Sequence, residues 1–178
     1  MNLLYRLIRV VIQSLFRDPI GFFDSSTLTF RVLPNDLDLN MHMTNSRYLS
    51  IMDLGRVDLV SRTKMGKSFL TGRWQAMLGA AHIRFRRGLS LFEQYQLITQ
   101  VIGVDDKWVY IEQRFESKGT VVAYAVVRGV FLKRGITVSL TDVLEELGVD
   151  DVSLPPLTDA LKKWKEADDA FKKSSRSD

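Results

Sequence analysis

The stretch that decides the fold runs from Asn35 to Leu49 and reads NDLDLNMHMTNSRYL. From Asp36 to Thr44 polar and apolar residues alternate strictly, which is typical of a half-buried strand. However, Asp and Asn are poor strand formers, and a strand would place Asp36 and Asp38 as neighbours on one face. We therefore predict a loop whose polar side chains converge on the start of the next helix.

That next helix is predicted from Ser46 to about Met65, because apolar residues recur on one broad face. Such a helix is expected to be buried. Thr44, Asn45 and Ser46 are candidate N-caps for it. The residues on its main apolar face are Tyr48, Met52, Gly55 and Leu59, with Leu49, Ile51, Val57 and Val60 beside them.

The chain on either side of this helix has the pattern of β-strands. Residues 105–107 (DDK) and 118–120 (KGT) are typical hairpin turns, so the last three strands are predicted to form an antiparallel meander. One antiparallel sheet wrapped around the long central helix buries that helix most economically, which predicts an α+β fold. The predicted strands are residues 27–33, 75–86, 95–104, 108–117 and 121–132.

Three segments are expected along the chain. They are an amphipathic N-terminal helix in residues 1–20, the main domain in residues 21–150, and a C-terminal helix and tail in residues 151–178. Residues 141–147 are predicted to form a short helix with Thr141 as its cap, and residues 157–173 a polar helix. The final SSRSD is expected to be disordered.

The N-terminal helix, MNLLYRLIRVVIQSLFR, carries an apolar stripe interrupted by arginines. Arg6 and Arg9 occur well before the roughly 18 apolar residues that a membrane span needs, and no small-residue cleavage site follows. Two roles remain open. Residues 1–17 either make a peripheral contact with a membrane, at its inner face in a cytoplasmic protein, or pack on the domain or on a partner subunit.

The composition of the 178 residues limits the chemistry. Cysteine is absent, which excludes disulfides and thiolate sites, and His42 and His82 alone cannot form a multi-histidine metal centre. The formal net charge of +4 is uneven, since residues 59–92 hold seven basic side chains and no acidic one. This block is compatible with phosphate contacts or with a solvated basic face. Residues 82–86 alternate as in an ordinary amphipathic strand, so no nucleic-acid partner is expected.

A family resemblance rests on NDLDLNMHMTNSRYLSIMDLGR, which resembles the signature of the hot-dog acyl thioesterases of the 4-hydroxybenzoyl-CoA thioesterase-like family. Further along, RFRRGLSLFEQYQLITQVIGVDDKWVYIEQRF is similar to proteins related to thioesterase superfamily member six. The likeness covers residues 27–132. The matching signature residues are Asp36, Asp38, His42, Asn45, Tyr48, Leu49, Asp53 and Arg56.

The resemblance implies a hot-dog fold, a homodimer or dimer of dimers, and hydrolysis of an acyl-CoA or acyl-carrier-protein thioester in lipid metabolism, without cofactor or metal. The family's catalytic carboxylate falls on Asp38, and the asparagine and histidine of its plant enzymes fall on Asn40 and His42. A carboxylate can attack a thioester carbonyl or deprotonate water, and helix N-terminal amides can stabilise the oxyanion. The residues expected to bind substrate at that helix start are Asn45, Ser46, Arg47 and Tyr48.

Several residues in the signature have structural interpretations instead. Asp36 is expected to bond backbone amides in a turn, and Asp53 and Arg56, three apart on the helix, to form a local ion pair. Met41 and Met43 are interpreted as lining for an apolar pocket or core.

This sequence also departs from the family pattern. Met41 replaces a glycine, Thr44 replaces an asparagine, and Gly88 replaces the glutamate that follows two arginines in the plant enzymes. A non-catalytic acyl-binding or membrane-associated protein on the same fold therefore remains the alternative function.

Overall fold

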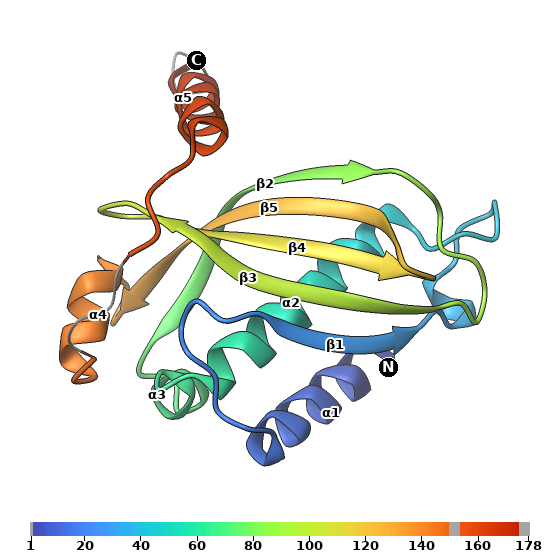
Figure 1. Ribbon diagram of the computed structural model, residues 1–178, viewed down its shortest axis with the longest axis horizontal. Coiled ribbons are helices and arrows are strands. Elements are labelled where there is room, and N and C mark those ends of the chain that lie inside the picture. Colours follow the sequence, from blue (N-terminus) through green and yellow to red (C-terminus); the bar gives the residue numbers. More distant parts are fainter. Residues whose placement is uncertain (1, 150–153, 175–178) are drawn as a thin grey trace.

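The computed structural model describes residues 2–149 and 154–174. These residues form one antiparallel sheet that curls around helix α2 (Asn45–Arg62), as Figure 1 shows. The strand order β1-β3-β4-β5-β2 contains the predicted meander of β3, β4 and β5. The predicted α+β arrangement is therefore confirmed. The strands are β1 (Ser26–Arg31), β2 (Gln75–Phe85), β3 (Gln94–Val104), β4 (Val109–Ser117), β5 (Thr120–Lys133) and the unpredicted β6 (Ile136–Val138), which pairs with β5.

Helix α2 lies against the concave face of the sheet because a glycine allows a close approach there. A Cβ at Gly55 would meet the hydroxyl of Thr99 and would lie 2.7 Å from Leu97 Cδ2. The helix ends at Arg62, not near Met65 as predicted, because Thr63 adopts an extended backbone conformation. The short helix α3 (Gly66–Leu70) follows.

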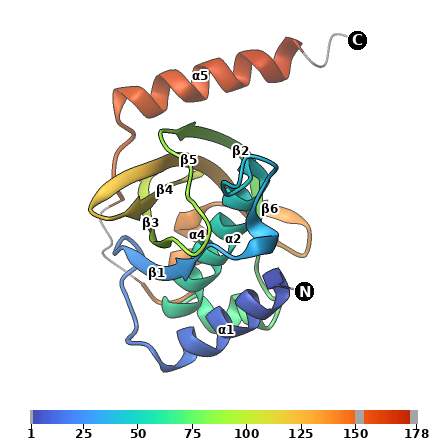
Figure 2. The ribbon, with the colours of Figure 1, turned by 90° about the vertical axis from the view of Figure 1, so that its right-hand side faces the viewer.

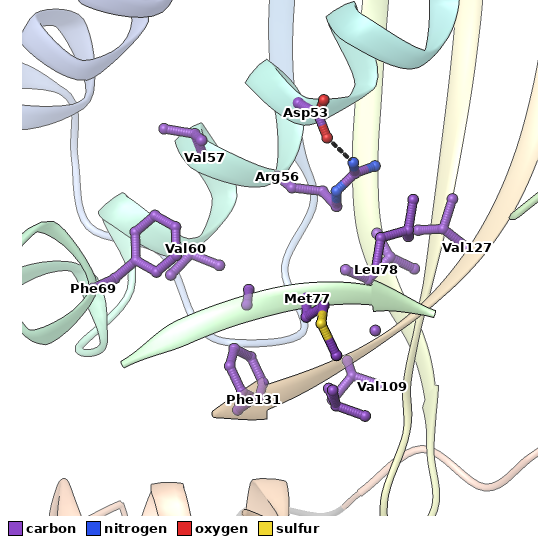
Figure 3. A pocket seen from close by; sticks show the side chains of 14 residues that line it. Asp53, Arg56, Val57, Val60, Phe69, Met77, Leu78, Val109, Val127 and Phe131 are labelled. Atoms are coloured by element: carbon purple, nitrogen blue, oxygen red, sulfur yellow. Dashed lines mark hydrogen bonds and ion pairs between the residues drawn. The ribbon is translucent and has the colours of Figure 1, made fainter. Parts of the chain in front are cut away.

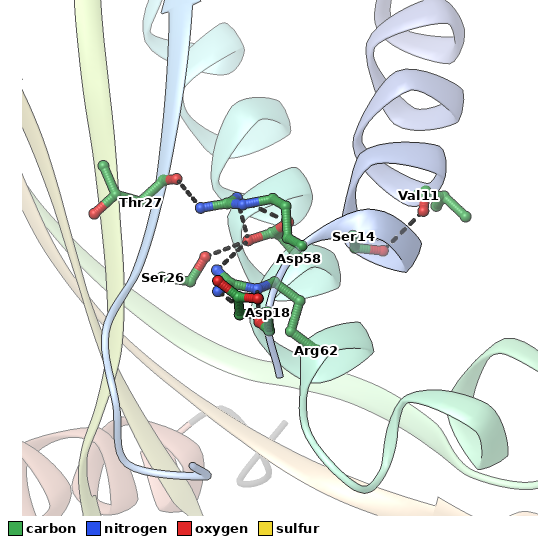
Figure 4. Close-up of polar contacts among 8 residues, drawn as sticks. Val11, Ser14, Asp18, Ser26, Thr27, Asp58 and Arg62 are labelled. Atoms are coloured by element: carbon green, nitrogen blue, oxygen red, sulfur yellow. Dashed lines mark hydrogen bonds and ion pairs between the residues drawn. The ribbon is translucent and has the colours of Figure 1, made fainter. Parts of the chain in front are cut away.

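Helix α1 (Asn2–Phe16) packs on α2 at the side away from most of the sheet (Figures 1 and 2). Two buried carboxylates attach this helix and the residue that follows it. Arg6 Nη2 lies 2.6 Å from Asp36 Oδ2, and Arg17 Nη1 lies 3.1 Å from Asp58 Oδ2. Figure 4 shows that Asp58 also accepts a hydrogen bond from the hydroxyl of Ser26 in β1. One carboxylate therefore connects the segment after α1 with α2 and the edge of the sheet.

Two more helices complete the fold, α4 (Leu140–Glu146) and α5 (Asp159–Ser174). Thr141 is not the cap of α4. Ser139 is, because its hydroxyl accepts a hydrogen bond from the Asp142 amide at 3.0 Å. Helix α5 covers the outer face of the sheet through Leu161 and Trp164. The tail SSRSD, predicted to be disordered, starts at Ser174, which is instead the last residue of α5. The rest of that tail, residues 175–178, lies outside the described residues.

Strand β2 is the last strand of the sheet. One of its edges pairs with β5, and the other has no partner strand among the described residues. Most of this strand is exposed, including large apolar side chains. Met77 is 54%, Leu78 43% and Phe85 42% exposed. Long exposed edges that carry apolar residues pair readily with another strand. Strand β2 therefore presents an unpaired edge with exposed apolar side chains.

Candidate active site

Residues 34–44 form the loop that the sequence predicts. A short 3-10 turn (Pro34–Asp36) opens it, and isolated bridges then join Leu37 to Met43 and His42 to Ser90. The strict alternation reflects these isolated bridges, not a continuous strand. Met41 lies at the tip with a φ of 59°, a left-handed conformation that glycine adopts without strain. The backbone conformation at the position where family members have glycine is thus one that favours glycine. Met41 is exposed, so its predicted role as lining of a pocket or core is wrong.

The Asp38 carboxylate is fixed by its own loop. Its Oδ1 accepts hydrogen bonds from the backbone amides of Asn40 at 2.8 Å and His42 at 3.2 Å. Among the described residues, the imidazole of His42 makes no hydrogen bond to the Asp38 carboxylate. The backbone amides of Asn40 and His42 therefore orient this carboxylate. Asp38 is exposed and open to a ligand.

Asp38 faces an open hollow of about 250 Å³, which we call the loop hollow. It lies between the loop, the first turn of α2 and the end of β2. The described residues that line it are Asp38, His42, Met43, Asn45, Tyr48, Phe85, Arg86, Arg87 and Gly88. Four of the predicted site residues therefore meet here: Asp38, His42, Asn45 and Tyr48.

The other predicted site residues do not line the loop hollow. Asn40 is exposed, and Ser46 Oγ lies 2.9 Å from Thr44 Oγ1. Arg47 faces the interior side of the loop, where its Nε lies 3.0 Å from Asp36 Oδ1. Asp36 is fully buried, and its Oδ2 also accepts a hydrogen bond from the Leu33 amide at 2.9 Å. Bonding a nearby backbone amide is the structural role predicted for Asp36.

The start of α2 supplies donors to the loop hollow. The first amides of a helix have no acceptor within the helix and lie at its positive end. Thr44 occupies the N-cap position, but its side chain makes no capping hydrogen bond. The amides of Asn45 and Ser46 thus have no capping side chain, and Asn45 is among the residues that line the loop hollow.

Gly88 has a local reason to be glycine. A Cβ at this position would lie 2.8 Å from His42 Cδ2 and 2.9 Å from His42 Cγ, which is too close. A glutamate here, as in the plant enzymes, would displace the imidazole. Gly88 and the position of His42 therefore belong together in this chain.

Two arginines at the end of β2 bring positive charge to the loop hollow, and the sequence indicated them only as part of a basic block. Arg87 binds Glu93 at 2.8 Å, and this lowers the pKa of Glu93 to about 2, so the pair stays charged well into the acid range. Arg86 makes no ion pair with the described residues. It is the exposed cation available to an anionic group beside Asp38.

A second feature, which we call the helix cavity, lies between α2 and the sheet and has a volume of about 160 Å³. Figure 3 shows its lining, which is apolar apart from one ion pair, Asp53–Arg56. That local pair is the one the sequence predicts. The apolar lining residues are Val57, Val60, Phe69, Ala76, Met77, Leu78, Val109, Ile111, Val127, Val130 and Phe131.

Arg56 is held at the wall of the helix cavity by a buried polar chain. It donates to Gln113 Oε1 at 2.6 Å, and Gln113 Nε2 donates to the Met52 carbonyl at 2.9 Å and to Thr99 Oγ1 at 3.1 Å. Burial lowers the pKa of Arg56, and Asp53 opposes this effect. The pair closes one side of the apolar space with fixed charges.

Metal-binding clusters and membrane-spanning helices are both absent from the described residues. No group of three or more His, Cys, Asp or Glu side chains is arranged to hold a metal ion in residues 2–149 and 154–174. Over the same ranges, every helix is too short or too polar to cross a membrane.

An antiparallel sheet around one helix, with a carboxylate loop at the start of that helix, defines a thioesterase-like hot-dog protein. Residues 32–164 match the model of the thioesterase-like superfamily, and the chain belongs to that superfamily. It is 32% identical to Protein THEM6 of Danio rerio over 161 residues, which cover 90% of this chain and 77% of that protein.

Solved structures confirm the hot-dog fold. The probable thioesterase YbaW from Escherichia coli aligns with a TM-score of 0.62 and 22% identity over 71% of this chain and 98% of its own. A thioesterase from Thermus thermophilus, solved in complex with coenzyme A and Zn, aligns with a TM-score of 0.59 and 20% identity over 72% of this chain and 94% of its own.

Proposed function

We propose that the protein hydrolyses an acyl thioester of coenzyme A or acyl carrier protein, with Asp38 as the reacting carboxylate. The observation that carries the proposal is the loop hollow. There an exposed carboxylate held by two backbone amides lies next to the uncapped N-terminus of α2. Membership of the thioesterase-like superfamily supports the same chemistry.

Each step of the proposed hydrolysis has a group in the loop hollow that can perform it. Asp38 either deprotonates a water molecule or attacks the thioester carbonyl itself. The carbonyl oxygen becomes an oxyanion, which the free amides of Asn45 and Ser46 stabilise. Collapse of this intermediate breaks the carbon–sulfur bond, and the thiol leaves after receiving a proton, for which His42 is a titratable side chain in the loop hollow. If Asp38 attacks directly, the product of this step is an acyl–Asp38 anhydride, which water then hydrolyses to restore the carboxylate. With water as the second substrate, the products are the acid and the free thiol.

Arg86 suits the carrier part of the substrate. It is exposed at the rim of the loop hollow, and phosphate groups are common to coenzyme A and to the phosphopantetheine arm of acyl carrier protein. Arginine binds phosphate with two parallel hydrogen bonds. The Thermus thermophilus relative binds coenzyme A, which favours this carrier without excluding the other.

The acyl group needs an apolar site, and we assign it to the helix cavity of a second protomer. In one chain the two features are lined from opposite ends of β2, where Met77 and Phe85 are separated by roughly 25 Å along the strand. Two β2 edges paired antiparallel about a two-fold axis would place the Phe85 end of one strand beside the Ala76 end of the other. The protein is then a homodimer in which Asp38 faces the partner's helix cavity.

The role of Asp38 is tested with Asp38→Asn, which keeps the size and removes the charge. We expect turnover of the best substrate in an acyl-CoA chain-length series to fall about 10²–10⁴-fold. The melting temperature should not change, because Asp38 is exposed. If Asp38→Asn turns over substrate like the wild type, the assignment is wrong. If the wild type binds acyl-CoA but does not hydrolyse it, the non-catalytic acyl-binding alternative is correct.

The composite site is tested by mixing two inactive variants. Val57→Phe fills the helix cavity, whereas Asp38→Asn removes the carboxylate. If each site takes Asp38 from one protomer and the cavity from its partner, half of the dimers in an equal mixture are mixed and each has one intact site. Roughly a quarter of wild-type activity should therefore return. If the two variants stay inactive together while native mass spectrometry shows mixed dimers, the site lies within one chain.

A further inference from the structure

We infer that the outward face of helix α1 docks the protein on an anionic lipid surface. The helix was expected either to pack on the domain or to lie in a membrane interface, and its structure allows both. One side of α1 is packed and a different side is apolar and exposed.

The packed side of α1 is fixed in the fold. Val10 and Ser14 are buried against the domain, and Leu3 and Leu7 are packed beside the core. Arg6 points the same way, where it binds Asp36 and the Arg31 carbonyl at 3.0 Å. The orientation of α1 is therefore set by the protein.

The other side of α1 carries large apolar side chains that nothing among the described residues covers. Leu4, Ile8, Ile12 and Leu15 recur at helical spacing and are 62%, 50%, 50% and 63% exposed. Tyr5 and Phe16 flank them near the two ends of the helix and are 68% and 85% exposed. Isolated exposed apolar residues are common on proteins, but six on one helix form a contiguous patch of the kind that marks an interaction site.

The chemistry of this face favours lipid over protein as its occupant. Helix α1 contains no acidic residue, and its exposed charged side chain is Arg9, next to Ile8. An apolar stripe of Leu, Ile and Phe bordered by a cation is typical of helices that lie in the membrane interface. Tyrosine places its ring in the apolar layer and its hydroxyl at the headgroups. A specific protein interface would be expected to offer more polar anchors than the Tyr5 hydroxyl.

Docking through α1 leaves the proposed site free. Helix α1 lies on the opposite side of the molecule from strand β2, as both ribbon views show. The contact between Arg6 and Asp36 joins the docked helix to the loop that carries Asp38. A protein held this way would keep the loop hollow at a constant orientation to the lipid surface.

The test is co-sedimentation of the full chain with vesicles of phosphatidylcholine, with and without phosphatidylglycerol. Ile12→Glu and Gln13→Glu form a matched pair, because both positions are exposed on α1 and each variant adds one negative charge. We expect Ile12→Glu to lower partitioning about tenfold, and Gln13→Glu to have a much smaller effect. Arg9→Gln should weaken binding to the vesicles that contain phosphatidylglycerol and leave the others unchanged.

The same experiment can overturn the inference. It is wrong if the wild-type chain does not sediment with either vesicle type, or if Ile12→Glu and Gln13→Glu have equal effects. It is also wrong if the wild type forms a larger oligomer that Ile12→Glu dissociates, because the face then binds protein. Thermal melting followed by circular dichroism checks that each variant is folded, and vesicle binding does not depend on the hydrolytic activity.

Discussion

The two sides of the loop at residues 34–44 carry the same residue type in opposite environments. On the inner side, Asp36 is fully buried and contacts Arg6 and Arg47 at 2.6 and 3.0 Å. On the outer side, Asp38 is exposed and is held only by backbone amides. Two residues along the chain thus separate a carboxylate whose charge is neutralised within the fold from one whose charge is available to a ligand.

This difference shows how the loop can be rigid and still present an accessible carboxylate. The ion pairs of Asp36 join α1, the loop and the first turn of α2, so the loop backbone is fixed from within. That backbone in turn orients Asp38 through the amides of Asn40 and His42. The role proposed for Asp38 requires one fixed geometry, and the neighbouring aspartate provides that support.

The largest expected effect on stability comes from Asp36→Asn. This change leaves Arg6 and Arg47 without their carboxylate in a buried site, and removing one partner of a buried ion pair costs about 3–5 kcal/mol. Urea denaturation should therefore show a large loss of unfolding free energy.

Asp38→Asn is the matched control, because it makes the same chemical change on the outer side of the loop. We expect its unfolding free energy to stay within about 0.5 kcal/mol of the wild type. Equal destabilisation by both variants would contradict the division of the loop into a structural and a reactive side.

A smaller effect, on activity only, is expected from Gly88→Ala. The new Cβ would lie 2.8 Å from His42 Cδ2, so the imidazole must move away from the loop hollow. A misplaced proton-transfer group should lower kcat/KM by roughly 10- to 100-fold, while the exposed position limits the loss of stability.

A double variant shows whether Gly88→Ala acts through the imidazole. If it does, adding Gly88→Ala to His42→Ala should change kcat/KM very little, because the displaced group is already absent. Independent, multiplying losses would mean that Gly88 matters for another reason.

Most of the fold could be predicted from the sequence, because it follows from local patterns. Turn residues defined the meander, and apolar periodicity defined the central helix. The ends of elements were less certain. The extended backbone of Thr63, which ends α2 early, and the reciprocal bonds between Ser139 and Asp142 depend on local conformations that many residues can adopt.

The site was only partly predictable. The spacing of Asp38, His42 and the helix start is local, so the sequence could bring them together. Arg86 and Gly88 reach the same hollow from the end of β2, a contact between distant segments that periodicity does not reveal. Which side of the loop Arg47 faces was equally hidden, since its partner Asp36 is buried by the folding of α1.

The smallest expected effect concerns Met41, at the tip of the loop between its two sides. A non-glycine residue with a φ of 59° is strained by about 1 kcal/mol, and glycine removes that strain at the cost of a more flexible unfolded chain. Met41→Gly should therefore raise the unfolding free energy by about 0.5 kcal/mol, measured by urea denaturation. Met41→Ala serves as the control, because it removes the exposed side chain and keeps the strain. If Met41→Ala stabilises the protein as much as Met41→Gly, the exposed thioether and not the backbone is responsible, and the tip of the loop is not strained.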